Sequence, residues 1–222
     1  MALTQGARNK IKSIVQSAKK LLMKEFESQL QQYYGIRPDG TCLLVEELTS
    51  REASVIETAR LLRQRLEYLE KGIAGSNKAP EAVRQLIREQ AFTILNRFSA
   101  VRMSEERNNI RESIRKGYNS EGFLVYDQLT GGAITAEQFT RYTWYIAYVF
   151  DELAIDLPAV FDRFSPYALL FPAEKVMLEL LDIINDEDLN IYRESGHQPI
   201  NLWKEDETIG WIYQYYNSRE EI

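Results

Sequence analysis

Apolar residues recur at helical spacing along most of the chain. Near the N-terminus they predict one helix from Thr4, its expected N-cap, to about Gln32. The positions on its inner face are Ile11, Val15, Ala18, Leu22 and Phe26. Turn residues at 33–40 end this helix. A capping box at 49–52 then predicts the start of a second helix, because a hydroxyl and a carboxylate three residues apart satisfy each other's backbone donors.

The second and third helices are separated by the small and polar residues 72–78. A heptad-like seam, too short for an extended coiled coil, predicts a helical hairpin; its positions are Val55, Ala59, Leu62, Leu66, Leu69 and Ile73. Pro80 suits the first turn of the third helix. The inner face of that helix is expected at Val83, Ile87, Ala91, Ile94, Phe98 and Val101. Dense charge at 104–116 indicates a solvated helix end.

The remaining pattern is also mainly helical. Residues 123–126 alternate and predict either a brief strand or an ordered loop. A second capping box at 135–138 predicts a helix to about residue 154, and further helices are expected at 172–184 and 205–217. The prediction is an all-α multi-helix bundle with at most a short β element at 123–126. Its expected divisions are an N-terminal helical hairpin, 1–76, and a larger helical domain, 77–222.

The distribution of charge suggests a candidate binding surface near the N-terminus. The 222 residues carry a net charge of -6, which gives no general attraction to nucleic acid. Residues 1–24 are nevertheless basic and contain no acidic side chain. Arg8, Lys12 and Lys19 lie roughly on one helix face and are candidate DNA-phosphate contacts. A charged solvent face, or a surface packed on an acidic partner, explains them equally well.

Catalytic chemistry is sparse. The single cysteine, Cys42, excludes an internal disulfide and is expected to be a small buried residue. The single histidine, His197, has no partner at nucleophile or metal spacing and is interpreted as a loop residue. Asp151, Glu152 and Asp156 have the chemistry for a divalent metal or a hydrolase, but a solvated helix end is the favoured interpretation. The prediction names no catalytic, cofactor-binding or metal-binding residue.

Other patterns exclude further classes of protein. Gly131-Gly132 is not followed by the Lys-Ser/Thr of a phosphate-binding loop. No apolar run approaches the roughly 18 residues that span a membrane, so we expect no membrane partner and a cytoplasmic location. The tyrosine-rich helix at 139–150 offers rings for base stacking, but tyrosines at helical spacing are more often part of a core.

Aromatic residues are concentrated at Trp203–Asn217, shortly before the chain stops. So much ring surface at a terminus predicts a cover from elsewhere. We therefore expect the chain to be the front part of a longer protein.

Three blocks carry a resemblance to a known family. The segment Gly210-Trp211-Ile212-Tyr213-Gln214-Tyr215-Tyr216 resembles one found in PglX-like adenine-specific DNA methyltransferases of BREX phage-exclusion systems, which are related to type II restriction–methylation enzymes. The helix at 96–105 resembles the Asn-Arg-x-x-Ala-x-Arg-Phe-x-Glu pattern of the same family, with Met103 in place of the aromatic residue and a shifted glutamate. Phe161 with 167–172 resembles a third block.

The resemblance implies a helical region that precedes a catalytic methyltransferase domain. That domain supplies the S-adenosylmethionine pocket and the Asn-Pro-Pro-Tyr-type loop that holds a flipped adenine. Ser165-Pro166-Tyr167 lacks the orienting residues of that loop and is interpreted as a helix-breaking turn. We therefore expect no cofactor and no methyl-transfer activity in this chain alone.

The resulting hypothesis is a non-catalytic scaffold from a restriction or phage-defence system. Its expected partners are the catalytic domain of the same polypeptide, double-stranded DNA and other defence-system subunits. Trp211, Tyr215 and Tyr216 are the candidate interdomain packing residues. The alternative is a stand-alone helical protein-interaction module whose acidic C-terminus binds a basic partner.

Overall fold

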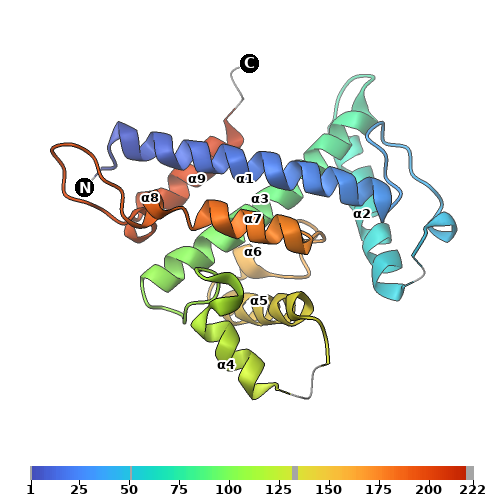
Figure 1. Ribbon diagram of the computed structural model, residues 1–222. Helices are drawn as coiled ribbons and strands as arrows, with labels where there is room; N and C mark the ends of the chain where they lie inside the picture. The colour runs from blue at the N-terminus through green and yellow to red at the C-terminus, as the bar shows by residue number, and fades with distance from the viewer. Residues whose placement is uncertain (1, 51, 132–134, 219–222) are drawn as a thin grey trace. The chain divides into compact units, whose positions relative to one another are not determined.

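Helices account for the regular structure of the chain. The computed structural model describes residues 2–50, 52–131 and 135–218. Its helices are α1 (Gln5–Gln32), α2 (Ala53–Gly72), α3 (Lys78–Glu106), α4 (Glu121–Leu129), α5 (Gln138–Ala154), α6 (Pro158–Phe161), α7 (Glu174–Ile184), α8 (Glu187–Asn190) and α9 (Glu207–Asn217) (Figure 1). Short 3-10 turns lie at Val45–Glu47, Gly117–Asn119 and Leu202–Lys204. The described residues form no strand, which confirms the all-α prediction.

The brief strand or loop expected at 123–126 is wrong, because this segment lies inside α4. Phe123 is buried and packs edge-on against Tyr142 of α5, with ring centroids 4.9 Å apart. This tertiary contact determines the local structure, although the short apolar run is compatible with a strand.

The N-terminal cap of α1 is as predicted, whereas those of α2 and α5 differ. Thr4 caps α1 as expected, since its hydroxyl accepts a hydrogen bond from the Ala7 amide at 3.2 Å. Both predicted capping boxes are wrong. The N-cap residues of α2 and α5 are Glu52 and Glu137, and neither makes a side-chain capping bond. Residue 51, inside the first box, and residue 132, in the Gly-Gly pair, lie outside the described residues.

The helices belong to two compact units, each built from segments far apart in the sequence. The first unit falls within 1–19, 95–162 and 174–222. Its core combines aliphatic and aromatic side chains. Fully or almost fully buried members include Ile11, Val15, Phe98, Val101, Phe123, Tyr142, Ile146, Phe161, Leu180, Trp203, Ile212 and Tyr216. Burial of Tyr142 and Tyr145 confirms the core interpretation for those tyrosines of α5.

The second unit falls within 20–94 and 163–173. Its apolar core includes Leu22, Phe26, Leu30, Ile36, Ala59, Leu62, Leu66, Leu86 and Leu170. Gln90, fully buried, ties the 163–173 segment to α3: its amide donates to the Pro166 carbonyl at 2.9 Å, and its oxygen accepts from the Leu169 amide at 2.8 Å. The boundary expected at residue 76, between an N-terminal hairpin and a larger helical domain, stays a prediction.

Within the described ranges, the helices lack the combination of length and apolar character required to cross a bilayer.

Candidate functional site

The predicted basic face of α1 and the predicted aromatic face of α9 meet in the first unit. The Arg8 guanidinium lies over the Trp211 ring, 4.8 Å from its centroid. Trp211 in turn stacks on Tyr215 at 5.4 Å and 24°. Glu207 links α9 to the N-terminal residues, because its carboxylate accepts hydrogen bonds from the Leu3 amide and from the Trp211 indole, each at 3.3 Å. Those two bonds hold the pKa of Glu207 below its usual value.

Lys19 meets α9 differently from Arg8. Its ammonium donates to the Tyr216 carbonyl at 3.1 Å and lies 5.1 Å from the centroid of the Tyr216 ring. Both side chains are buried, at 9% and 1% exposure. Lys19 therefore supplies a donor to a carbonyl in the last turn of α9, where the helix dipole favours a cation.

The predicted phosphate contacts thus have unequal access to solvent. Lys12 is exposed and forms no ion pair with any side chain that the structure describes. Arg8 is half-buried against Trp211, and Lys19 is buried against α9. Among the predicted packing residues, Tyr216 is already buried within the chain's own unit, whereas Trp211 and Tyr215 are half-buried. The geometry therefore leaves Lys12 and Arg8 as the accessible cations, and Trp211 and Tyr215 as the accessible rings.

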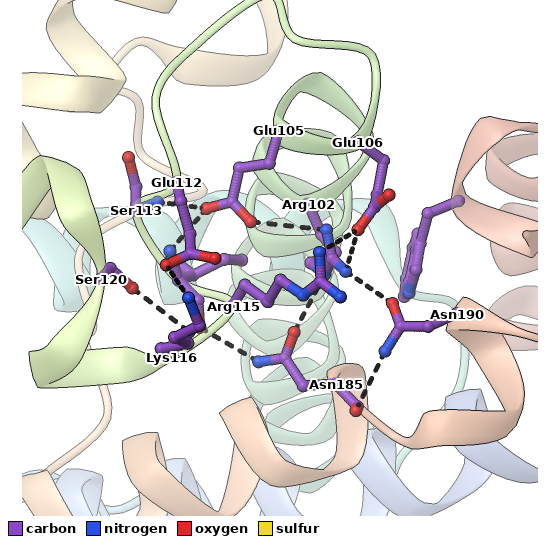
Figure 2. A network of polar contacts seen from close by, with 12 residues as sticks. Arg102, Glu105, Glu106, Glu112, Ser113, Arg115, Lys116, Ser120, Asn185 and Asn190 are labelled. Carbon is purple, nitrogen blue, oxygen red and sulfur yellow. Dashed lines mark hydrogen bonds and ion pairs between the residues drawn. The ribbon is translucent and has the colours of Figure 1, made fainter.

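A buried ionic network lies at the C-terminal end of α3 (Figure 2). Arg102 is completely buried and donates to Asn185 at 2.9 Å and Asn190 at 2.5 Å, besides pairing with Glu105 and Glu106. Glu106 also accepts from Asn201 at 2.9 Å, and Arg115 approaches it to 3.3 Å. Four hydrogen bonds from the guanidinium, two of them to carboxylates, are what allow the charge to be buried.

The solvated helix end expected at 104–116 is wrong for Glu105, although Arg107, Arg111, Arg115 and Lys116 of the same segment are exposed. Glu105 is only 8% exposed, and its carboxylate accepts from the Ser113 and Ile114 amides, both at 2.5 Å. Burial raises the pKa of Glu105 to about 7, against the opposing effect of these amides and Arg102. The charged segment folds back on α3, and these contacts hold it there.

A pocket of about 470 Å³ opens between this folded-back segment and helices α4 and α5. Its walls combine Tyr126, Tyr145 and Tyr148 with the charged side chains Arg111 and Glu152. The Tyr145 hydroxyl lies 2.6 Å from Ser113 Oγ, and the Tyr148 hydroxyl donates to Glu152. This size and mainly apolar lining are typical of small-ligand sites.

Among the candidate catalytic and metal-binding residues, Glu152 lines this pocket, whereas Asp151, Asp156, His197 and Cys42 do not. Asp151, Glu152 and Asp156 are exposed, in agreement with the solvated interpretation. The described residues contain no group of His, Cys, Asp and Glu arranged to hold a metal ion. His197 lies exposed in a loop, as expected. Cys42 is exposed, so its expected burial is wrong: the neighbouring Leu43 and Leu44 are exposed as well, and this apolar run is not part of the core.

Comparison with known proteins gives one informative match. The chain is 26% identical to the adenine-specific methyltransferase PglX of Lacticaseibacillus casei (strain Zhang), over an alignment of 247 positions that covers 94% of the chain. The chain spans only 19% of the length of that relative. No family model and no solved structure matches it. The chain is therefore weakly similar to part of an adenine-specific methyltransferase.

The blocks that carry the resemblance hold structural residues. In the 96–105 block, Arg97 donates to the Val160 carbonyl at 2.8 Å, and Arg102 and Glu105 form the buried network. In the C-terminal block, Tyr216 is buried. Sequence reasoning missed the network because its partners come from positions 80 to 90 residues away, although an arginine and two glutamates three and four residues apart do signal an ion pair.

Proposed function

We propose that this chain is a non-catalytic helical region of an adenine-specific DNA methyltransferase from a restriction or phage-defence system. The observation that carries the proposal is the similarity to PglX along 94% of the chain but only 19% of that relative. A region of this size accounts for a small part of such a polypeptide, and S-adenosylmethionine would bind the catalytic part.

The buried positions of the resembling blocks support a scaffolding role. Arg97 and Arg102 use their guanidinium groups to hold other segments of the chain, so their chemistry is already committed to the fold. The proposed scaffold packs against the catalytic domain through the Trp211 and Tyr215 face of α9. Stacked, half-buried aromatic rings are well suited to such an interface.

The experiment compares a methyltransferase polypeptide that carries residues 1–222 with the same polypeptide lacking them, and with the isolated chain. We expect DNA adenine methylation by the complete polypeptide, loss of its stability or methylation on deletion, and neither methylation nor S-adenosylmethionine binding by the isolated chain. Methylation or cofactor binding by the chain alone would reject the proposal. An unchanged deletion variant would reject the scaffolding role.

DNA contact is the second part of the proposal and is assigned to Arg8 and Lys12. Exposure of Lys12 supports it, because an exposed lysine can release a phosphate counterion. Binding of a labelled duplex to the chain should weaken steeply between about 50 and 200 mM salt. Lys12→Glu should weaken binding and reduce the salt slope, whereas Lys175→Glu, at an exposed lysine of α7, should change binding less. Equal effects of the two variants would leave only the scaffold role.

A further inference from the structure

The second unit contains a complete arginine site within the chain. The Arg65 guanidinium lies over two rings, 4.9 Å from the centroid of Tyr68 and 4.5 Å from that of Tyr167. Its Nε and Nη2 atoms donate to the two carboxylate oxygens of Glu89, each at 3.0 Å. Two tyrosine rings and one glutamate thus surround a guanidinium group in this protein.

The pocket between α4 and α5 is lined by the same kinds of group, tyrosine rings and a glutamate. Tyr126 and Tyr148 stack with ring centroids 6.4 Å apart and planes inclined by 29°. Glu152 lies one turn after Tyr148, and the Tyr148 hydroxyl donates to one of its carboxylate oxygens. No ion pair joins Glu152 to another side chain in the described part of the chain, and its carboxylate is exposed to solvent.

We propose that this pocket binds the guanidinium group of an arginine side chain in a basic segment of a partner protein. A guanidinium is planar, stacks on tyrosine rings and matches a carboxylate with paired donors. The pocket volume of about 470 Å³ is ample for such a side chain. Glu152 and Asp156 are both exposed, and the segment 148–156 carries no basic residue, which favours a basic partner. This inference does not depend on the methyltransferase proposal.

Arg111 decides between this ligand and its main competitor. Its side chain also lines the pocket, and it is exposed. A second guanidinium in the pocket would be repelled by Arg111, whereas the phosphate of a nucleotide stacked on the same tyrosines would be attracted by it. Removal of Arg111 therefore changes the affinities of the two ligands in opposite directions.

The test titrates the isotope-labelled chain with a short peptide that contains one arginine among glycines and serines, followed by amide NMR. A matched peptide has citrulline, which has the shape of arginine without its charge. We expect saturable shifts at Tyr126, Tyr148 and Glu152 with the arginine peptide and none with the citrulline peptide. Glu152→Gln should weaken binding by up to about fivefold, and Arg111→Ala should strengthen it.

Matched variants control for general effects. Glu121→Gln changes an exposed glutamate of α4 that does not line the pocket, and should leave the affinity unchanged. Tyr148→Ala should abolish the shifts, whereas Tyr33→Ala, at a similarly exposed tyrosine of the other unit, should not. The absence of pocket shifts at about 10 mM arginine peptide, or equal shifts with citrulline, would overturn the proposal. Binding of adenosine monophosphate that Arg111→Ala weakens would assign the pocket to nucleotides instead.

Discussion

The ammonium of Lys19 lies 3.1 Å from the carbonyl oxygen of Tyr216, and both side chains are buried. The sequence pattern predicts that Lys19 contacts DNA phosphates and that Tyr216 packs between domains. Their contact joins α1 to the C-terminal end of α9 inside one compact unit. Lys19 therefore stabilises the fold, and its effect on stability can be separated from any effect on DNA.

Lys19→Ala should lower the free energy of unfolding by about 1–3 kcal/mol, because a buried carbonyl loses its charged donor. Lys12→Ala, at an exposed position of the same helix, should change it by less than about 0.5 kcal/mol. Urea denaturation followed by circular dichroism measures both values. Similar losses in the two variants would contradict the structural role of Lys19.

The contact between Arg8 and Trp211 can be measured by a double-mutant cycle. Arg8→Ala, Trp211→Leu and the double variant should give a coupling free energy of about 0.5–1 kcal/mol, as expected for a partly exposed cation–π pair. Thermal unfolding of the four proteins supplies the values. Additive effects would show that the stacking on Tyr215 and the bond to Glu207 position Trp211 without help from Arg8.

Two helical glycines have opposite environments. A Cβ atom at Gly122 in α4 would overlap the Tyr145 hydroxyl and lie 2.9 Å from the Glu112 carbonyl oxygen, whereas one at Gly210 in α9 would meet no atom within 4 Å. Gly122→Ala should therefore destabilise the chain by about 1–3 kcal/mol. Gly210→Ala should stabilise it by about 0.5–1 kcal/mol through helix propensity. Midpoints of thermal unfolding that shift in the same direction would refute this contrast.

Helix periodicity predicted most of the fold because it depends on local spacing. The long helices α1 and α3 each repeat apolar residues over seven or eight turns, and their cores lie where expected. Helix α4 was missed because Phe123 and its neighbours gain their helical structure from packing on Tyr142. The α1–α9 face was predicted as two separate sets of residues, since nothing in the local sequence indicates that Arg8 and Trp211 meet.

The buried ionic network around Arg102 cannot be predicted from neighbouring residues in the sequence. A dense run of charge is usually solvated, and only the fold brings Asn185 and Asn190 to Arg102. The pocket tyrosines were recognised as aromatic but were not assigned to a cavity, because Tyr126 and Tyr148 come from different helices.

Glu105 should make stability depend on pH in a defined window. Its pKa is raised to about 7 in the folded chain, mainly by burial, from an unfolded value of 4.5. Between these two values the folded state binds more protons than the unfolded state, so stability falls as pH rises from about 4.5 to 7. Below about pH 4.5 the stability contributed by the raised pKa of Glu105 is fully present, and above about pH 7 it is lost.

Comparison with Glu105→Gln isolates this contribution from those of other groups. The glutamine keeps an oxygen for the Ser113 and Ile114 amides but does not titrate. The stability of the native chain relative to this variant should decrease by up to about 3 kcal/mol between pH 4.5 and 7, the equivalent of a shift of about 2.5 pKa units. Urea denaturation at half-unit pH steps supplies the curve. A relative stability that rises across the window would instead mean that Arg102 and the two amides outweigh burial and keep Glu105 ionised.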